Sequence, residues 1–418
     1  MSDPDTYAIE GLLLRLGRLS LEAGVDTSHA HRLVSRAAAA LKVDTQLFIG
    51  SERLLLMTNR FESGDTRIGH AIAGFGINAA RSVKLEHVVD ALAVGMLNFD
   101  QAVARLEEIE RDHGLYPAWV IVVAVAATAA ALARLFGALW PVVVGAFVAG
   151  LASALVKRWF VSSSLNPVTT ALFTAFISGV AGVAVLRLFA DSAAALTLTA
   201  AGMILVPGVP LINGISDLVQ GHPTMGVARL ANALVTILAI ASGLLLASQA
   251  TGAVFPVLQA PGNVGVAEDL LFSAIAAFGY VTLFNVPAPA IWLCIACGMI
   301  THGSRTAMSI CGMNIASATL ISAVLGGLIA CLFARKSGLP WTVFAFPGVV
   351  AMIPGSYAFR SAIGFSHILT MGAATPLTLV AETLSASVAV AFMTTAVGIG
   401  LFAAFSIARA IPWFRLKC

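Results

Sequence analysis

The sequence predicts an α-helical integral membrane protein with ten transmembrane helices, arranged as two inverted five-helix repeats and preceded by a small α+β soluble domain. Three observations predict this fold class. Of the 418 residues, 59% are hydrophobic and 11% are charged, against roughly 25% charged in a soluble globular protein. Apolar runs long enough to cross a membrane recur from Trp119 to Ile407. The second half of this membrane part also repeats the first.

The first 115 residues carry charges at ordinary soluble density and hold no spanning run, so we expect a cytoplasmic α+β domain over residues 1–115. The run TYAIEGLLLRLGRLSLEAG has helical apolar spacing and stops at Gly24, which can end a helix. Asp26 or Thr27 can then cap a second helix that runs to about Leu41.

Three β-rich runs, TQLFIG, RLLLMTN and TRIGHAI, predict a small sheet, and two more helices close the domain. The last helix starts at Asn98, where Gln101 has capping-box spacing, and ends at His113. Scattered polar residues of this domain could be assembled into a hydrolytic site. No nucleophile motif or metal-ligand spacing favours that over solvated surface groups. These residues are His29, His31, Ser51, Glu52, Arg60 and His70.

Ten later segments have the length and apolar character of transmembrane helices. They cover residues 118–137, 140–157, 167–189, 193–213, 230–250, 267–286, 289–304, 315–334, 340–358 and 377–407. We expect them to form a first membrane repeat over residues 116–252 and a second over residues 265–410.

Basic residues predict the orientation of these helices. If residues 1–115 are cytoplasmic, eight basic residues fall on cytoplasmic connections: Lys157, Arg158, Arg229, Arg335, Lys336, Arg409, Arg415 and Lys417. Four fall toward the outside: Arg134, Arg187, Arg305 and Arg360. The positive-inside rule therefore predicts a multi-pass membrane protein with both termini in the cytoplasm.

The repeat appears when residue numbers are shifted by 148 (289 minus 141). Matched pairs at this shift are Pro141 and Pro289, Gly150 and Gly298, Lys157 and Arg305, and Asn166 and Asn314. At a shift of 147, Pro207-Gly208 falls on Pro354-Gly355, and Asn213 falls opposite Arg360. Each unit has five spans, an odd number, so the second copy must lie inverted in the membrane, as in many secondary transporters.

The fourth span of each repeat is interrupted, by VPGVPLING and by FPGVVAMIPGSYAFR. Proline removes a backbone donor, and hydrocarbon tolerates the exposed carbonyls only beside protein or a water-filled cavity. Opened helix ends offer N–H groups to a carboxylate and C=O groups to a cation. The substrate-binding residues predicted at these breaks are Pro207, Gly208, Pro354, Gly355 and Ser356. Kinks that serve packing alone are the alternative.

Further polar residues are candidates for the same site. Arg360 could bind a substrate carboxylate bidentately, or it could be an interfacial arginine. Asn213 and Asp217 follow the first break and are predicted to bind substrate as well. Asn166 and Asn314 open the third span of each repeat, where they could bind substrate or, as the simpler interpretation, cap a helix.

Two carboxylates are candidates for proton coupling. Glu382, within LVAETLSAS, could carry a proton if it is buried, or it could lie at the outer boundary. Asp217 and Arg229 flank QGHPTMG after the first break and could pair or gate this segment, or lie in a solvated loop.

We expect no cofactor and no metal. Cys294 and Cys297 form a CxxC, but within an apolar run they are better explained as small packing residues. His222, His302 and His367 lie singly near segment ends, where an interfacial position is expected for each.

Several stretches also resemble the threonine/serine exporter family in its fused two-half form. They are LGRLSLEAGVDTSHAHRLVSRAAAAL, NFDQAVARLEEIE, ILVPGVPLINGISDLVQGHPTMGVARLANAL and PGSYAFRSAIG. The chain is similar to the two-component succinate exporters as well. The resemblance implies ten membrane helices and proton-driven export of threonine and serine or of dicarboxylates. The residues that match the family motifs are Pro207, Gly208, Asn213, Asp217, Pro354, Gly355 and Arg360.

The main prediction is a proton-coupled exporter of small carboxylated metabolites, threonine or serine, and not an enzyme. A succinate exporter of the same fold is the alternative, and a membrane-anchored hydrolase and a passive channel are rivals from other classes. The expected partners are a small-molecule substrate, protons and the lipid bilayer. The net charge of +3 gives no argument for nucleic acid. A homo-oligomer is left open.

Overall fold

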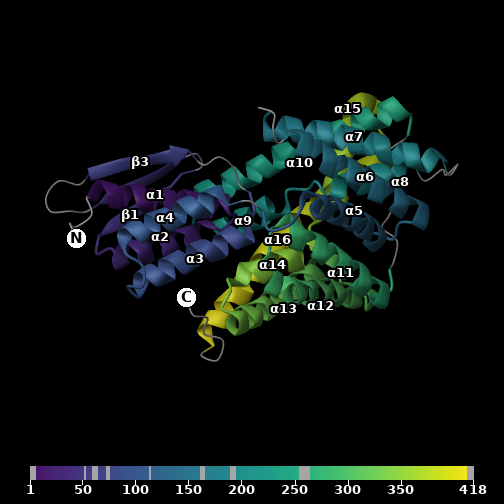
Figure 1. Ribbon diagram of the computed structural model, residues 1–418. Coiled ribbons are helices and arrows are strands. Elements are labelled where there is room, and N and C mark those ends of the chain that lie inside the picture. Colours follow the sequence, from purple (N-terminus) through teal and green to yellow (C-terminus); the bar gives the residue numbers. More distant parts are fainter. Residues whose placement is uncertain are drawn as a thin grey trace. The chain divides into compact units, whose positions relative to one another are not determined.

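The computed structural model describes residues 6–50, 53–58, 65–71, 76–112, 114–160, 165–188, 194–253 and 264–411, most of them helical (Figure 1). The chain divides into two compact units. The N-terminal unit contains Met1–Leu115, Asn213–Leu230 and Phe284–Pro287. The helical unit contains Tyr116–Ile212, Ala231–Leu283 and Ala288–Cys418.

The N-terminal unit combines helices with a three-stranded antiparallel sheet of order β1-β2-β3. Its elements within residues 6–112 are α1 Thr6–Glu22, α2 Thr27–Ala40, β1 Thr45–Ile49, β2 Arg53–Thr58, β3 Asp65–Ala71, α3 Ala79–Ala93 and α4 Phe99–Arg111. The three β-rich runs are therefore strands, and Leu47 of β1 lies opposite Leu56 of β2.

Local capping signals set the helix ends of this unit. Gly24, with φ of 90°, follows α1, and a Cβ there would lie 2.6 Å from the carbonyl oxygen of Gly76. Only glycine fits this left-handed position without strain. The side chain of Asp26 accepts from the N–H of His29 at 2.8 Å and caps α2. Asn98 starts α4 with the predicted capping box.

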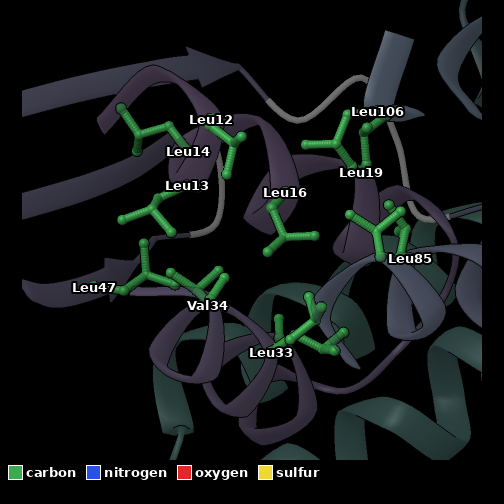
Figure 2. Packing of buried hydrophobic residues seen from close by; sticks show 14 of the residues in the cluster. Leu12, Leu13, Leu14, Leu16, Leu19, Leu33, Val34, Leu47, Leu85 and Leu106 are labelled. Atoms are coloured by element: carbon green, nitrogen blue, oxygen red, sulfur yellow. The ribbon is translucent and has the colours of Figure 1, made fainter. Parts of the chain in front are cut away.

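A leucine-rich core holds the N-terminal unit together. Leucines of α1 pack against side chains of α2, β1, α3 and α4 (Figure 2). The labelled members are Leu12, Leu13, Leu14, Leu16, Leu19, Leu33, Val34, Leu47, Leu85 and Leu106. Each fully buried leucine contributes about 1.5–3 kcal/mol, so this cluster is the main source of stability in the unit.

Seven helices of the described residues are long and apolar enough to cross a membrane. They are α5 Ala118–Leu135, α6 Trp140–Phe160, α7 Pro167–Leu188, α10 Pro223–Thr251, α11 Val266–Leu283, α13 Ile315–Ser337 and α16 Leu377–Ala410. A bent pair raises the number to eight if it counts as one span, with an angle of 46° between Trp341–Met352 and Gly355–Ala374.

The elements of the bent pair are α14 Trp341–Val349, η2 Val350–Met352, α15 Gly355–Met371 and η3 Gly372–Ala374. The remaining elements are α8 Ala194–Met203, α9 Gly208–Val219, η1 Ala288–Ala290 and α12 Ile291–Ile310.

The spanning helices are fewer than the ten expected from the sequence. The predicted segment 193–213 is divided into α8 and α9, and α8 has only 10 residues, about half the length a membrane crossing needs. The predicted segment 289–304 corresponds to α12, which continues beyond it to Ile310 through the polar run THGSRT. The other eight segments coincide with the seven long helices and the bent pair.

The helix bounds recur at the predicted shifts. Adding 148 to the bounds of α5 gives those of α11, and adding 148 to the start of α7 gives the start of α13. The start of α9 becomes that of α15 when 147 is added (355 minus 208).

Equivalent glycines make equivalent contacts inside the helical unit. A Cβ on Gly150 would lie 2.9 Å from the Cβ of Ala129, and one on Gly298 would lie 2.7 Å from the Cβ of Ala277. Ala129 and Ala277 are counterparts at the shift of 148, as are the two glycines. The pair α5–α6 therefore packs at this point like the pair α11–α12.

The last helix of each repeat also has a glycine in close contact with the third span, although Gly243 and Gly400 are not counterparts at either shift. A Cβ on Gly243 of α10 would lie 2.3 Å from the carbonyl oxygen of Leu172, and one on Gly400 of α16 would lie 2.9 Å from that of Leu320. Leu172 and Leu320 are also counterparts at the shift of 148. Both helix pairs approach closely only because glycine has no side chain.

Candidate functional site

The two predicted interruptions lie side by side in the helical unit. A Cβ added to Gly208 would lie 2.6 Å from the Cδ1 of Ile353 and 2.9 Å from a Cγ of Val350. A Cβ added to Gly355 would lie 2.7 Å from a Cγ of Val206. Each interruption therefore needs its glycine because the other one is so close.

This contact is reciprocal. Gly208 touches Ile353, and Gly355 touches Val206. Adding 147 to Val206 and Gly208 gives Ile353 and Gly355, so each glycine meets the counterpart of its own neighbour. Reciprocal contacts of this kind are produced by a local two-fold axis.

Two helices begin at the meeting point. Gly208 is the first residue of α9 and Gly355 the first of α15, each directly after a proline. The N–H groups of Gly208 and Gly355 already donate to the carbonyl oxygens of Val206 and Ile353, each at 2.8 Å, so only later N–H groups of each first turn lack a partner in their own helix. The start of a helix also carries positive dipole character. Pro354, at the N-cap of α15, makes no side-chain cap hydrogen bond. The arrangement can therefore attract an anionic group.

Arg360 and Glu382, predicted for different roles, form an ion pair. Nη2 of Arg360 on α15 lies 3.4 Å from Oε2 of Glu382 on α16. The arginine side chain is 9% exposed and the glutamate side chain 47%. Arg360 is four residues after Ser356, so both lie on one face of α15, and Ser356 is buried.

Asn213 and Asp217 belong to the N-terminal unit, and both bond to backbone groups of that unit. The Nδ2 of Asn213 donates to the carbonyl oxygen of Gly24 at 2.8 Å, and Oδ1 of Asp217 accepts from the N–H of Thr27 at 2.9 Å. Both side chains are buried. They hold the turn between α1 and α2, a contact that the sequence alone did not predict.

Arg229 completes this polar contact. Its Nε lies 3.3 Å from Oδ2 of Asp217, and its Nη2 donates to the carbonyl oxygen of Val25 at 3.1 Å. The two side chains are 1% and 0% exposed. The structure therefore shows that Asp217 and Arg229 pair with each other and do not lie in a solvated loop.

Asn166 and Asn314 are helix caps. The side-chain oxygen of Asn166 accepts from the N–H of Val168 at 2.8 Å, and that of Asn314 from the N–H of Ala316 at 2.8 Å. Both residues are exposed at the starts of α7 and α13. Their capping interpretation holds, and neither polar group is directed to the meeting helix ends.

A buried polar cluster was missed by the sequence analysis. His302 and Arg305 were expected at boundaries, but both are buried on α12, beside Asp269 of α11. Their i, i+3 spacing within one segment was the available signal. The predicted end of that segment at residue 304 separated the two.

Of the residues proposed for a hydrolytic site, the structure describes the side chains of His29 and His31 only, and both have other contacts. His29 lies 2.7 Å from Glu86, and His31 stacks on His222. Ser51, Glu52 and Arg60 lie outside the described residues, as does the side chain of His70. Among the residues that the structure describes, no group of three or more His, Cys, Asp or Glu could hold a metal ion.

Long apolar helices and paired breaks define a multi-pass α-helical membrane protein. Residues 11–251 match the threonine/serine exporter family model, and residues 269–408 match a second model, "Threonine/Serine exporter, ThrE". The chain belongs to the threonine/serine exporter family and is a membrane exporter, as the resemblance implied. No solved structure matches the chain.

Proposed function

We propose that the protein is a proton-coupled antiporter that exports a small α-amino acid, threonine or serine, across the inner membrane. The substrate is held where α9 and α15 begin, and both termini are cytoplasmic. The observation that carries the proposal is the reciprocal contact of Gly208 and Gly355.

Two inverted five-helix repeats explain that contact. The matched glycine packing supports two copies of one helical unit, and the reciprocal contact supports a local two-fold axis between them. In this proposal each copy crosses the membrane five times, with α8–α9 and α12 counted beside the seven long helices and the bent pair. An odd number of crossings in each copy requires that axis to lie in the membrane plane. Alternating access can then arise from movement of one copy against the other around the shared site.

The charges near the breaks favour an amino acid over a dicarboxylate. The N-terminal end of α15 and the guanidinium of Arg360 attract the substrate carboxylate, and Glu382 attracts its ammonium group. A dicarboxylate would bring its second negative charge toward Glu382 and be repelled. We therefore assign Arg360 and Glu382 to the two charged ends of the substrate. Pro207, Gly208, Pro354 and Gly355 place the two helix starts beside it, and Ser356 offers it an N–H and a hydroxyl group.

We assign Asn213 and Asp217 to holding the α1–α2 turn, because their polar atoms bond to it. Glu382 and Asp217, the two carboxylates predicted to carry the proton, are thus assigned to substrate binding and to the α1–α2 turn.

Transport in proteoliposomes tests the proposal. Purified protein should accumulate labelled threonine or serine against its gradient when a pH gradient is imposed, and succinate should be a poorer substrate. Arg360→Ala should lose about tenfold to hundredfold in transport, the value of a charge-assisted hydrogen bond. Arg187→Ala, which removes an exposed arginine at the end of α7, is the matched control and should transport normally.

Two results would contradict the proposal. Threonine flux that ignores the pH gradient would indicate a passive channel. Normal transport by the Arg360→Ala variant would remove this residue from the substrate site.

A further inference from the structure

Four polar side chains meet between α11 and α12, inside the helical unit. Asp269 comes from α11, and His302, Arg305 and Thr306 come from α12. The side chains of His302 and Asp269 are 2% and 1% exposed. Polar groups buried among membrane helices are costly, and they usually have a functional reason.

The contacts fix the protonation of the histidine. Nδ1 of His302 lies 2.8 Å and 2.9 Å from the two carboxylate oxygens of Asp269, and the hydroxyl of Thr306 donates to Oδ2 at 2.6 Å. Nη2 of Arg305 lies 2.5 Å from Nε2 of His302. A guanidinium can only donate, so Nε2 must accept, and the imidazole is neutral with its proton on Nδ1.

A second proton cannot enter this arrangement without moving Arg305. An imidazolium has N–H groups on both nitrogens, so protonated His302 would direct a donor at the guanidinium donors of Arg305. The two cationic groups would also repel each other. Nε2 can therefore hold either a proton or the hydrogen bond from Arg305.

The position of Arg305 is linked to the second helix break. Its Nη1 donates to the carbonyl oxygen of Met352 at 3.4 Å, and Met352 ends η2 two residues before Pro354. Displacing Arg305 removes this bond. Proton binding on His302 thus changes a contact of the segment that leads into the substrate site.

The cluster is not a packing requirement of the repeat. At the shift of 148, Asp269 corresponds to Ile121 and His302 to Ala154. The helices α5 and α6 nevertheless pack with the same glycine contact as α11 and α12. Lys157, the counterpart of Arg305, is exposed. A purely structural role does not explain why only the second repeat buries charges here.

In the part of the chain that the structure describes, few charged or titratable groups surround His302. Asp269 faces it from α11 and Arg305 from α12. The element η2 contributes the Met352 carbonyl, and Tyr357 of α15 lies within electrostatic reach of Arg305. On the α13 side of α12, the hydroxyl of Ser304 donates to that of Ser322 at 3.0 Å, a pair without ionisable groups. No charged or titratable contact to His302 from α14 is described.

We propose that His302, oriented by Asp269 and alternately engaged and released by Arg305, carries the proton that drives export. This inference rests on the proposed proton-coupled function and names the group that does the coupling. The protonated and unprotonated cluster differ in the position of Arg305, and the Met352 contact transmits that difference to the break.

The test separates coupling from substrate movement. Full-length protein in proteoliposomes is assayed for threonine accumulation under a pH gradient and for exchange of labelled against unlabelled threonine at equal pH. His302→Gln should lose gradient-driven accumulation and retain exchange at no less than about a tenth of the wild-type rate, a cost below about 1.4 kcal/mol. His367→Gln, which removes another histidine of the helical unit, should accumulate threonine normally. Glu382→Gln should lose both activities, because it binds substrate.

A second variant gives an independent result. Arg305→Gln shortens the side chain and removes its charge, so the contacts with Nε2 of His302 and with the Met352 carbonyl oxygen cannot both be kept. Gradient-driven accumulation should fall by about tenfold or more, while exchange at equal pH persists.

The outcomes are distinguishable. If His302→Gln accumulates threonine like the wild type, or loses exchange together with accumulation while its unfolding temperature is unchanged, the inference is overturned and the proposed function stands. If the wild type itself shows no gradient-driven accumulation, the proposed function fails first. If His302→Gln does not fold, the Arg305→Gln variant decides, and gradient-driven accumulation at the wild-type level overturns the inference.

Discussion

The ion pair between Asp217 and Arg229 should be a major determinant of stability. The two atoms lie 3.3 Å apart, and both side chains are buried. At an effective dielectric constant of about 20, two unit charges at this distance attract by about 5 kcal/mol, and desolvation of both groups offsets much of it. Removing one partner leaves the other charge buried and unpaired, and costs about 3–5 kcal/mol.

An exposed pair in the same unit provides the control. Arg105 and Glu108 lie 2.7 Å apart, closer than the buried pair, but their side chains are 61% and 68% exposed. Such a pair is worth about 0–1 kcal/mol. If burial decides the effect, Asp217→Ala should destabilise several times more than Glu108→Ala, although the control pair is the closer one.

The measurement is unfolding of the detergent-solubilised protein, followed by fluorescence at a single heating rate. Asp217→Ala and Arg229→Met should each lower stability strongly. The double variant Asp217→Ala/Arg229→Met should lose at least about 2 kcal/mol less than the sum of the single effects, since neither charge is then left alone. Additive losses, or an Asp217→Ala effect as small as that of Glu108→Ala, would refute the reasoning.

Two further predictions concern pH and close packing. Burial lowers the pKa of His31 below its ordinary value of 6.5, and His222 beside it lowers the pKa further. As the pH falls, the unfolded chain therefore binds this proton before the folded protein does, and the stability should fall below a pH of about 6.5. The His31→Gln variant should show a flatter dependence of stability on pH in this range. An unaltered dependence would exclude His31 as the cause. Gly243→Ala places a Cβ 2.3 Å from the carbonyl oxygen of Leu172 and should destabilise by about 1–3 kcal/mol in the same unfolding assay. The control Gly11→Ala, with nothing within 4 Å of the added atom, should stabilise the helix by about 0.5–1 kcal/mol, and equal effects of the two would contradict the close approach.

Features encoded within a few residues were predictable from the sequence. The caps at Asp26 and Asn98 depend on a side chain and a backbone group three residues apart, and both formed as expected. The breaks at Pro207 and Pro354 follow from a missing N–H, and they lie beside each other because the repeat places both at the fourth span of its unit.

Features that depend on distant partners were not predictable. Asp217 bonds to Thr27, which is 190 residues away, and nothing near either residue indicates the other. The burial of His302 depends on Asp269 in the preceding helix, and the polar run around it looks like the end of a membrane segment. Periodicity and capping rules report on neighbours along the chain, so such pairings become visible only in three dimensions.

The mutual fit of Gly208 and Gly355 has a consequence for how this gene can evolve. A larger residue at either position would need room made by its neighbour in the opposite half, and that neighbour is the counterpart of a residue beside the altered one. A substitution that compensates for a larger residue at one glycine must therefore arise in the other half of the chain. We expect the two halves to accumulate substitutions at these positions as a matched set.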